Sequence, residues 1–404
     1  MKILHTADWH IGKKLHKHDL YADFDLFIKW LCTCISTNKV DVLLVSGDIF
    51  DLANPSSEAR KQYYKALMQL RKLDCVIILT GGNHDSPAML DAPKEILREL
   101  EMHVIGGLPP NLEDCIVPLK RNGKTEVVIA AIPFLRDSDL RNATEGSTYE
   151  DRLEAIRKGI LNTFREAAEI CKKNYPGVPA LAMGHLFAAG SETSDSERDI
   201  QIGNQAAFNA LQFGSYFKYI ALGHIHKPQR ISAAVPVFYS GSPIPLSFSE
   251  RKDEKRLLLL DTKNGWIPAN IPVPAFRKLL KISGTIEELR LKLSSLEEPF
   301  ELDSLIEVEL KENLYNARKI FELDELISNF HAAGYEIVKH RATFLQQIKG
   351  ATELYKNSQP LEDLTPKDIF SQLIEKQKYD VETQEELKAA FNELLQEVHQ
   401  SENA

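Results

Sequence analysis

Residues 219–226, YIALGHIH, place two histidines directly after a short apolar run. The run Tyr219–Leu222 has the length and composition of a buried strand. Side chains two apart in an extended segment point the same way, so His224 and His226 can bind neighbouring metal ions. One such pair also arises by chance, and the remainder of the sequence has to decide between the two explanations.

Four other apolar runs end in the same kind of residue. Asp8 and His10 follow Lys2–His5, Asp48 follows Val42–Ser46, Asn83, His84 and Asp85 follow Val76–Thr80, and His185 follows Ala180–Met183. Ligand sites of open α/β sheets lie at the carboxyl ends of their strands. Glycines next to these residues, such as Gly47 and Gly223, allow close approach of the backbone. We therefore predict one site at this edge.

The donor set predicts the kind of site. Mixed imidazole and carboxylate ligands suit manganese, iron or zinc better than calcium. The seven candidate ligands are Asp8, His10, Asp48, Asn83, His185, His224 and His226. Seven groups are too many for one ion, but they fit two ions about 3.5–4 Å apart that share a carboxylate, as in two-metal phosphoester hydrolysis.

Composition limits the partners only in part. The chain has 404 residues and a net charge of −9, but residues 381–404 hold six Glu and one Lys, a net charge of −5. The acidity is therefore concentrated at one end, and a nucleic-acid partner stays open. Five scattered cysteines predict reduced thiols in a cytoplasmic protein. No apolar run reaches about 18 residues, so we expect no membrane span.

The order of elements predicts an α/β fold. Helical patterns at 21–35, 57–73 and 151–173 alternate with the strands, and further strands are expected at 127–131, 237–240 and 257–260. This alternation favours a sandwich or doubly wound layer over residues 1–270. Three prolines, Pro268, Pro272 and Pro274, predict that the run 267–275 is a linker.

A small α/β domain is expected at 275–343. Its elements are strands at 276–282, 305–310 and 335–339, a helix from the capping box Thr285-x-x-Glu288, and a helix over 317–333. Residues 344–363 predict a linker, and 364–404 a tail of two short helices. Their apolar stripes either pack on the protein's own body or dock a partner helix or coiled coil.

The five strand ends resemble a known family signature. Asp8-x-His10, Gly47-Asp48, Gly82-Asn83-His84-Asp85, Gly184-His185 and Gly223-His224-x-His226 resemble the calcineurin-like metallophosphoesterases. More narrowly, ILHTADWHIGK (3–13), SGDIFDLANPSSEAR (46–60), GGNHDS (81–86), ALGHIHKPQ (221–229) and YSGSPIPLSFSE (239–250) resemble the nuclease subunits of bacterial SbcCD complexes. The resemblance covers roughly residues 1–250. It implies a metallophosphoesterase sandwich, a small capping domain and a C-terminal helical tail.

The resemblance also implies roles for the site residues. Asp8, His10 and His226 bind one ion, Asn83, His185 and His224 bind the second, and Asp48 bridges both. His84 stays off the metals and acts on the phosphate or the leaving oxygen, with Asp85 orienting it. Archaeal and eukaryotic relatives carry a second histidine three residues after the bridging aspartate. Here that position is Asp51, so the role of that histidine does not transfer.

Cofactors and partners follow from the same resemblance. It implies two Mn²⁺ ions per subunit, with Mg²⁺ as the alternative. It also implies ATP-linked 3′→5′ exonuclease action on duplex DNA and endonuclease action on hairpins and single strands. It implies a homodimer, formed through helices such as 21–35 and 57–73, within a heterotetramer. The tail helices would dock the coiled-coil root of the ATPase subunit, SbcC. The sequence lacks a G-x-x-x-x-G-K-[ST] loop, so no ATP site is expected in this chain.

Some interpretations remain open. Lys13, Lys14 and Lys17 follow the first metal motif and form either a solvated loop or a contact with the DNA backbone. A phosphatase or small-molecule phosphodiesterase could use the same metal core. The texts GDIFDLA and GNHD differ, however, from the GDxxDRG and GNHE of serine/threonine phosphatases. A non-catalytic scaffold with a decayed site is the other alternative, against which the intact ligand set argues.

Overall fold

The computed structural model describes residues 1–140, 148–197, 207–296, 300–344, 370, 374 and 383–391. Residues 1–311 and 318–343 form one compact unit, and residues 312–317 with 344–404 form a second. In the described part of the chain, no helix is both long and apolar enough to cross a membrane.

The first sheet has six strands in the order β14-β13-β1-β4-β5-β6. Its strands are β1 (Lys2–Thr6), β4 (Val42–Ser46), β5 (Val76–Thr80), β6 (Met102–Ile105), β13 (Arg256–Asp261) and β14 (Ala269–Pro272). Strands β1, β4, β5 and β6 are parallel, and β13 runs antiparallel to β1. The carboxyl ends of β1, β4 and β5 therefore lie at one edge.

The second sheet has the order β11-β12-β10-β9-β8-β7. Its strands are β7 (Ile116–Arg121), β8 (Lys124–Ala131), β9 (Ala180–His185), β10 (Ile220–Gly223), β11 (Gln229–Ile231) and β12 (Val237–Tyr239). The four inner strands are parallel, and β7 and β11 are antiparallel edges. All eight strands expected in residues 1–270 are present, which confirms the predicted α/β class.

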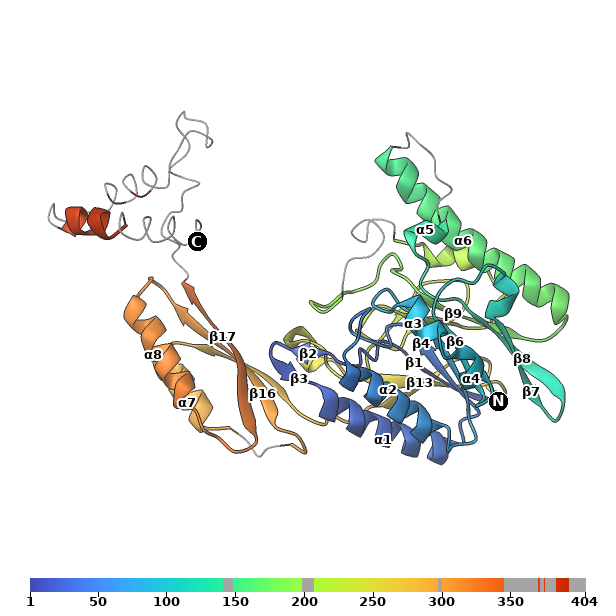
Figure 1. Ribbon diagram of the computed structural model, residues 1–404, viewed down its shortest axis with the longest axis horizontal. Coiled ribbons are helices and arrows are strands. Elements are labelled where there is room, and N and C mark those ends of the chain that lie inside the picture. The colour runs from blue at the N-terminus through green and yellow to red at the C-terminus, as the bar shows by residue number, and fades with distance from the viewer. Residues whose placement is uncertain are drawn as a thin grey trace. The chain divides into compact units, whose positions relative to one another are not determined.

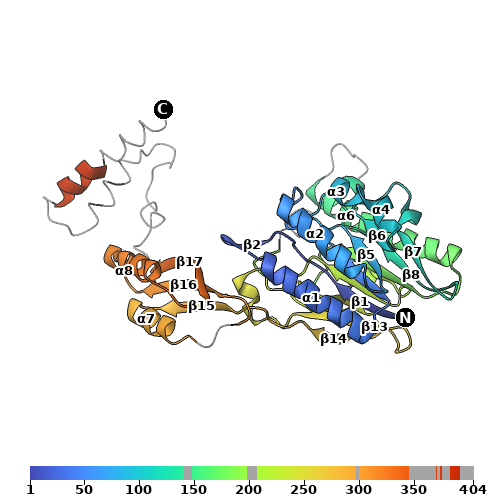
Figure 2. The same ribbon diagram turned by 60° about the horizontal axis from the view of Figure 1, so that its bottom comes forward.

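The two sheets pack face to face between layers of helices. In β1, the side chain of Ile3 joins the core between the sheets, while Leu4 joins the core under helices α1 (Tyr21–Asn38) and α2 (Ser57–Leu70). This alternation is the period of a strand buried on both faces. Helix α6 (Tyr149–Asn174) covers the second sheet with Ile156 and Phe164. Figures 1 and 2 show α1 and α2 side by side on the first sheet.

The proline-rich run is strand rather than linker, so this prediction was wrong. Residues Ala269–Pro272 form β14, which pairs antiparallel with β13 so that Pro272 lies opposite Arg256. Strand β14 is the edge of its sheet. An edge strand tolerates prolines because one side of it has no hydrogen-bonded neighbour to which a missing N–H would be lost.

The region 276–343 contains a small three-stranded sheet with two helices. Its elements are β15 (Leu279–Gly284), α7 (Ile286–Ser294), β16 (Ser304–Glu312), α8 (Ala317–Ser328) and β17 (Tyr335–Phe344). The order is β15-β16-β17. The Thr285 side chain accepts a hydrogen bond from the Glu288 N–H, which confirms the predicted cap. Helix α8 ends at Ser328, five residues earlier than expected.

A buried ion pair ties this small sheet to the sandwich. The guanidinium of Arg277 donates to both carboxylate oxygens of Asp23 in α1, at 2.6 and 2.7 Å. Both side chains are 6% exposed. Arg277 and the small sheet belong to the same compact unit as the sandwich, while the predicted domain boundaries at 270 and 343 stay predictions.

The remaining described elements are short. They are β2 (Lys14–Leu15), β3 (His18–Asp19), α3 (Pro87–Asp91), α4 (Lys94–Arg98), α5 (Asp137–Leu140), and 3₁₀ turns at Leu112–Cys115, Ala210–Phe213 and Phe248–Lys252. In the tail, residues 383–391 are helical, in agreement with the helices predicted for 364–404. The rings of Phe370 and Phe391 stack, with centroids 3.9 Å apart. The expected linker at 344–363 lies outside the described residues, apart from residue 344.

Candidate metal centre

The structure brings the five predicted strand ends together. Each ligand-bearing segment leaves a parallel strand at its carboxyl end, and the two sheets stack with these ends on one side. The side chains converge because the strands of both sheets run in the same direction along the shared core. The predicted residues Asp8, His10, Asp48, His84, Asp85, His185, His224 and His226 are all at most 2% exposed.

The backbone at this edge adopts an unusual conformation. Asp8, His10, Asp48 and His224 have positive φ angles of 55°, 45°, 50° and 103°. Residues with side chains rarely adopt this region, and such strain collects at functional sites, where the surrounding structure enforces it. The sharp turns aim these side chains back over the strand ends.

One cluster contains Asp8, His10 and His226, whose ligand atoms lie within 4.8 Å of one another. The Nε2 atoms of His10 and His226 are 3.1 Å apart. Two ring nitrogens and a carboxylate aimed at a common point form a three-donor set for a divalent cation. The sequence prediction grouped these same three residues.

A second cluster contains His185 and His224 beside Asn83. The Asn83 Oδ1 lies 2.9 Å from His185 Nε2 and 3.2 Å from His224 Nδ1. The ligand atoms of Asp48, His185 and His224 again fall within 4.8 Å of one another. This set also matches the predicted grouping.

Asp48 lies between the two clusters. Its Oδ2 is 3.5 Å from His10 Nε2 and 3.4 Å from His185 Nε2. Its Oδ1 accepts a hydrogen bond from the His84 N–H at 2.9 Å. One carboxylate oxygen therefore faces imidazoles of both clusters, as a bridging ligand must.

Glycines are required here because of close packing. A Cβ on Gly223 would lie 1.7 Å from the Ser46 carbonyl oxygen, and one on Gly82 would lie 2.1 Å from Asp48 Oδ1. Real Cβ atoms do not come this close, so any side chain at either position would push apart the segments that carry the ligands.

His84 lies beside the first cluster, and its ligand atom falls within 4.8 Å of those of His10 and Asp48, so its predicted place off the metals stays a prediction. Its ring centroid is 4.6 Å from that of His10, and its Nδ1 is 2.7 Å from the Asp51 carbonyl oxygen. That carbonyl fixes the ring, and no sequence pattern indicates this contact. The Asp85 carboxylate binds the backbone: it accepts hydrogen bonds from the N–H groups of Ile49, Phe50 and Gly82 at 2.8–3.0 Å. The orienting role predicted for Asp85 stays a prediction.

The Asp51 side chain lies between His10 and Lys13. Its Oδ1 is 3.3 Å from His10 Nδ1 and 3.1 Å from Lys13 Nζ. Burial raises the pKa of Asp51, but the contacts with His10 and Lys13 outweigh it and hold the pKa below its usual value. A carboxylate behind a ligating imidazole fixes the ring and increases its basicity.

A second support lies behind His226, and sequence reasoning missed it. The Ser196 hydroxyl is 2.6 Å from His226 Nδ1 and donates to the Glu250 carboxylate. Glu250 is fully buried and pairs with Lys255 at 2.6 Å. Glu197 accepts the His226 N–H at 2.8 Å. The only signal for this support in the sequence was the glutamate that ends the motif YSGSPIPLSFSE (239–250).

The electrostatics of the cluster favour a bound cation. Burial raises the pKa of Asp8 to about 7, although His185 and His226 act to lower it. Burial acts to lower the pKa of His185, but Asp48 and Asp8 outweigh it and raise the value to about 9. An imidazolium thus offsets the buried carboxylates in the metal-free protein, and a metal ion would take over that role.

Two buried atoms test the fit directly. Asp8 Oδ2 and His224 Nε2 have no hydrogen-bond partner among the described residues. Buried polar atoms are almost always satisfied, so orphans inside a His/Asp cluster point to a missing ligand. The residues present therefore fit a divalent metal.

The predicted DNA-contacting lysines lie in the loop after β1. Lys13 is 19% exposed and pairs with Asp51, which links it to the metal centre. Lys14 is 59% exposed and pairs with Asp19, and Lys17 is exposed. The structure thus places one of the three directly beside the site residues.

Comparison with known proteins agrees with this geometry. A family model described as calcineurin-like phosphoesterase matches residues 1–228, and one described as the type 5 capsule protein repressor C-terminal domain matches residues 275–378. Fold and site thus define a metal-binding phosphodiester hydrolase of the calcineurin-like class, with the predicted sandwich. Within this class, the chain belongs to the SbcD family, the nuclease subunits of SbcCD complexes.

Three relatives illustrate that membership. The SbcD nuclease subunit of Escherichia coli K12 is 31% identical over 407 residues, which cover 98% of each chain. That of Rhodobacter capsulatus is 38% identical over 70% of this chain and 71% of its own. That of Bacillus subtilis is 31% identical over 66% of this chain and 67% of its own.

Proposed function

We propose that this chain is the DNA-cleaving subunit of a nuclease–ATPase complex and hydrolyses phosphodiester bonds with two divalent ions. The observation that carries the proposal is the position of Asp48 Oδ2, 3.5 Å from His10 and 3.4 Å from His185. Asp8, His10 and His226 would hold one ion, Asn83, His185 and His224 would hold the other, and Asp48 would be shared between them. Mixed nitrogen and oxygen donors suit Mn²⁺, with Mg²⁺ as the alternative.

When bound, two such ions polarise the phosphate and provide a nucleophile at neutral pH. The chain's own residues do the rest. Asp51 fixes His10, and Ser196 with Glu250 fixes His226. His84, held through Nδ1 by the Asp51 carbonyl, presents its other nitrogen to the substrate. An imidazole there can orient the phosphate or protonate the leaving oxygen. Asp85 fixes the two loops that carry Asp48 and His84.

The substrate and partner assignments rest on the family. The relatives are named as subunits of SbcCD, which supports DNA as the substrate and SbcC as the partner. We propose ATP-linked 3′→5′ exonuclease action on duplex ends, endonuclease action on hairpins and single strands, and a role in DNA repair, replication and recombination. A homodimer within a heterotetramer is proposed, with residues 364–404 on the coiled-coil root of SbcC.

The decisive experiment compares wild type with His84→Gln. Both proteins are given Mn²⁺, SbcC, ATP, and an end-labelled duplex or hairpin, and bound metal is counted separately. We expect the variant to bind as much metal as wild type and to lose cleavage by about 10²-fold or more. His331→Gln, the same change at an exposed histidine, is the matched control.

Two results would contradict this assignment. Wild type that leaves DNA intact but hydrolyses a generic phosphomonoester would favour the phosphatase alternative. Equal cleavage by His84→Gln would remove His84 from the chemistry. Deletion of residues 364–404 tests the partner: we expect it to abolish co-purification with SbcC while metal binding is retained, and unchanged co-purification would refute the docking role.

A further inference from the structure

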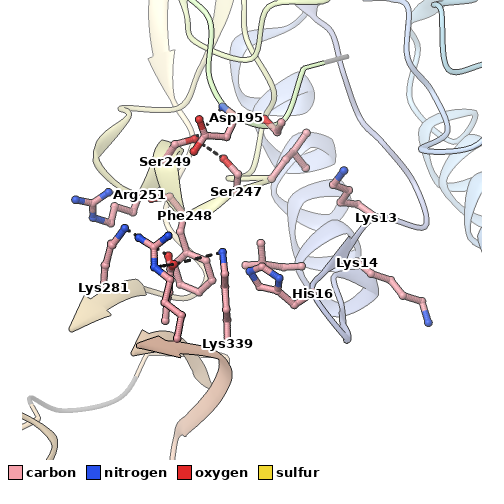
Figure 3. A pocket seen from close by; sticks show the side chains of 15 residues that line it. Lys13, Lys14, His16, Asp195, Ser247, Phe248, Ser249, Arg251, Lys281 and Lys339 are labelled. Atoms are coloured by element: carbon pink, nitrogen blue, oxygen red, sulfur yellow. Dashed lines mark hydrogen bonds and ion pairs between the residues drawn. The ribbon is translucent and has the colours of Figure 1, made fainter. Parts of the chain in front are cut away.

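A groove of about 510 Å³ lies between the sandwich and the small sheet. One side comes from the loop after β1, the other from the turn at Phe248–Lys252 and from strands β15, β16 and β17. Figure 3 shows Lys13 and Lys14 on one side and Arg251 and Lys281 on the other. The groove thus joins residues that are far apart in the sequence.

Positive charge dominates the lining. The lining contains six cationic residues and two acidic ones; the cations are Lys13, Lys14, Arg251, Lys281, Lys339 and Arg341, and the acids are Asp195 and Glu307. The Glu307 side chain is buried, and its carboxylate oxygens lie 3.3–3.9 Å from the side-chain nitrogens of Lys281, Lys339 and Arg341. Glu307 therefore holds these three cations together. Their side chains remain 30%, 37% and 47% exposed, which leaves them able to contact an anion.

A flat ring lies among these charges. The His16 imidazole is exposed and stacks on Phe248 with an interplanar angle of 23° and a centroid distance of 5.9 Å. Phe248 is 6% exposed, so it supports the ring from one side. Burial and the nearby Lys339 lower the pKa of His16, which favours the neutral ring. Cations beside a supported aromatic ring are the pattern of single-strand binding sites.

The groove connects to the metal centre on both walls. Lys13 lines it and contacts Asp51, which lies against His10. Ser196 also lines it, and its hydroxyl contacts His226. A strand whose scissile phosphate lies at the metals has its neighbouring phosphates within reach of the groove, since successive phosphates are only a few ångströms apart.

We propose that this groove holds an unpaired segment of the nucleic-acid substrate, with its phosphates on the cations and one base stacked on His16. The inference rests on the proposed nuclease function and adds to it the surface that holds the unpaired segment and the ring that stacks on one of its bases. Duplex bases are already stacked on one another and cannot use the ring, whereas an unpaired base can.

Binding in the absence of metal tests the proposal without cleavage. The full chain in EDTA is titrated into fluorescein-labelled oligothymidine of about 16 nucleotides and into a duplex of equal length, across a series of salt concentrations. Lys339→Gln/Arg341→Gln removes two cations, and a single strand loses about 0.7 per contact in the salt slope. We expect the salt slope of the double variant to be smaller than that of wild type by about 1.4. Its loss of oligothymidine affinity relative to wild type should therefore be about 25-fold greater at 0.1 M salt than at 1 M salt.

The ring is tested separately. His16 has a φ of 56°, which asparagine tolerates, so His16→Asn removes the ring without straining the turn. We expect about fivefold or greater loss of oligothymidine affinity, an unchanged salt slope, and recovery in His16→Tyr. Lys292→Gln is the matched control for the double cation variant, because Lys292 lies on α7, pairs there with Glu288 and does not line the groove.

Oligothymidine binding equal to wild type in both the double variant and His16→Asn would overturn the proposal. So would an equal loss of duplex affinity in His16→Asn, because the ring would then not select unpaired bases. The nuclease assignment fails separately, if wild type with Mn²⁺, SbcC and ATP cleaves no DNA. Groove variants that lose oligothymidine binding would still support the groove in that case.

Discussion

Glu250 offers a sharp test of how the protein supports its metal ligands. Its carboxylate is fully buried and accepts hydrogen bonds from Lys255 at 2.6 Å, Ser242 at 3.1 Å and the Leu246 N–H at 3.2 Å. Burial raises the pKa of Glu250, but Lys255 and His226 outweigh it and hold the pKa well below its usual value. Glu250→Gln keeps the shape and removes the charge.

The expected cost has two parts. Lys255 is 5% exposed, and in the variant Asp253, 3.7 Å away, is its remaining carboxylate partner among the described residues. We therefore expect a cost of about 3 kcal/mol of unfolding free energy, the lower end of the range for a broken buried pair. The variant also removes the charge that the Ser196 hydroxyl contacts behind His226. Loss of such an outer partner lowers metal affinity by about 10–100-fold.

Urea unfolding in EDTA measures the first effect, and Mn²⁺ titration followed by EPR measures the second. Glu95→Gln is the control, since Glu95 is 73% exposed and its removal should change stability by less than about 0.5 kcal/mol. Adding Lys255→Met to Glu250→Gln should recover part of the stability. A loss under about 1 kcal/mol in the single variant, or no recovery in the double variant, would refute the reasoning.

Three further predictions follow from the fold. Burial lowers the pKa of His5 to about 3, so only the unfolded chain takes up a proton at this residue as pH falls below about 6.5. Between pH 7.5 and 4.5, His5→Gln should therefore lose about 2.7 kcal/mol less unfolding free energy than wild type. Equal losses in urea unfolding would contradict this. Gly223→Ala should abolish Mn²⁺ binding in calorimetry, because its Cβ meets the Ser46 carbonyl; binding like wild type would show that this contact relaxes. Arg277→Met leaves Asp23 buried and unpaired and should cost about 3–5 kcal/mol, with faster hydrogen exchange in β15–β17; exchange like wild type would show that other contacts fix the small sheet.

Local patterns account for most of what could be predicted. Strands, helices and caps follow from the order of apolar residues and from side chains such as Thr285, which act over a few positions. The proline-rich run failed for the same reason. Pro272 lies in a strand because its segment pairs with β13, which is distant enough that a local pattern around Pro272 carries no information about it.

The sequence by itself determined which donors this protein offers to a metal. Residue type and position after a strand are local properties, and parallel strands carry their ends to one edge, so Asp8, His10 and His226 could be grouped in advance. The tertiary structure alone decided what holds those donors. The Asp51 carbonyl on His84 and the contact of Ser196 with Glu250 join segments 33 and 54 residues apart. Such contacts have no local signature, because they exist only once strands distant in the sequence have assembled into sheets and brought their loops together.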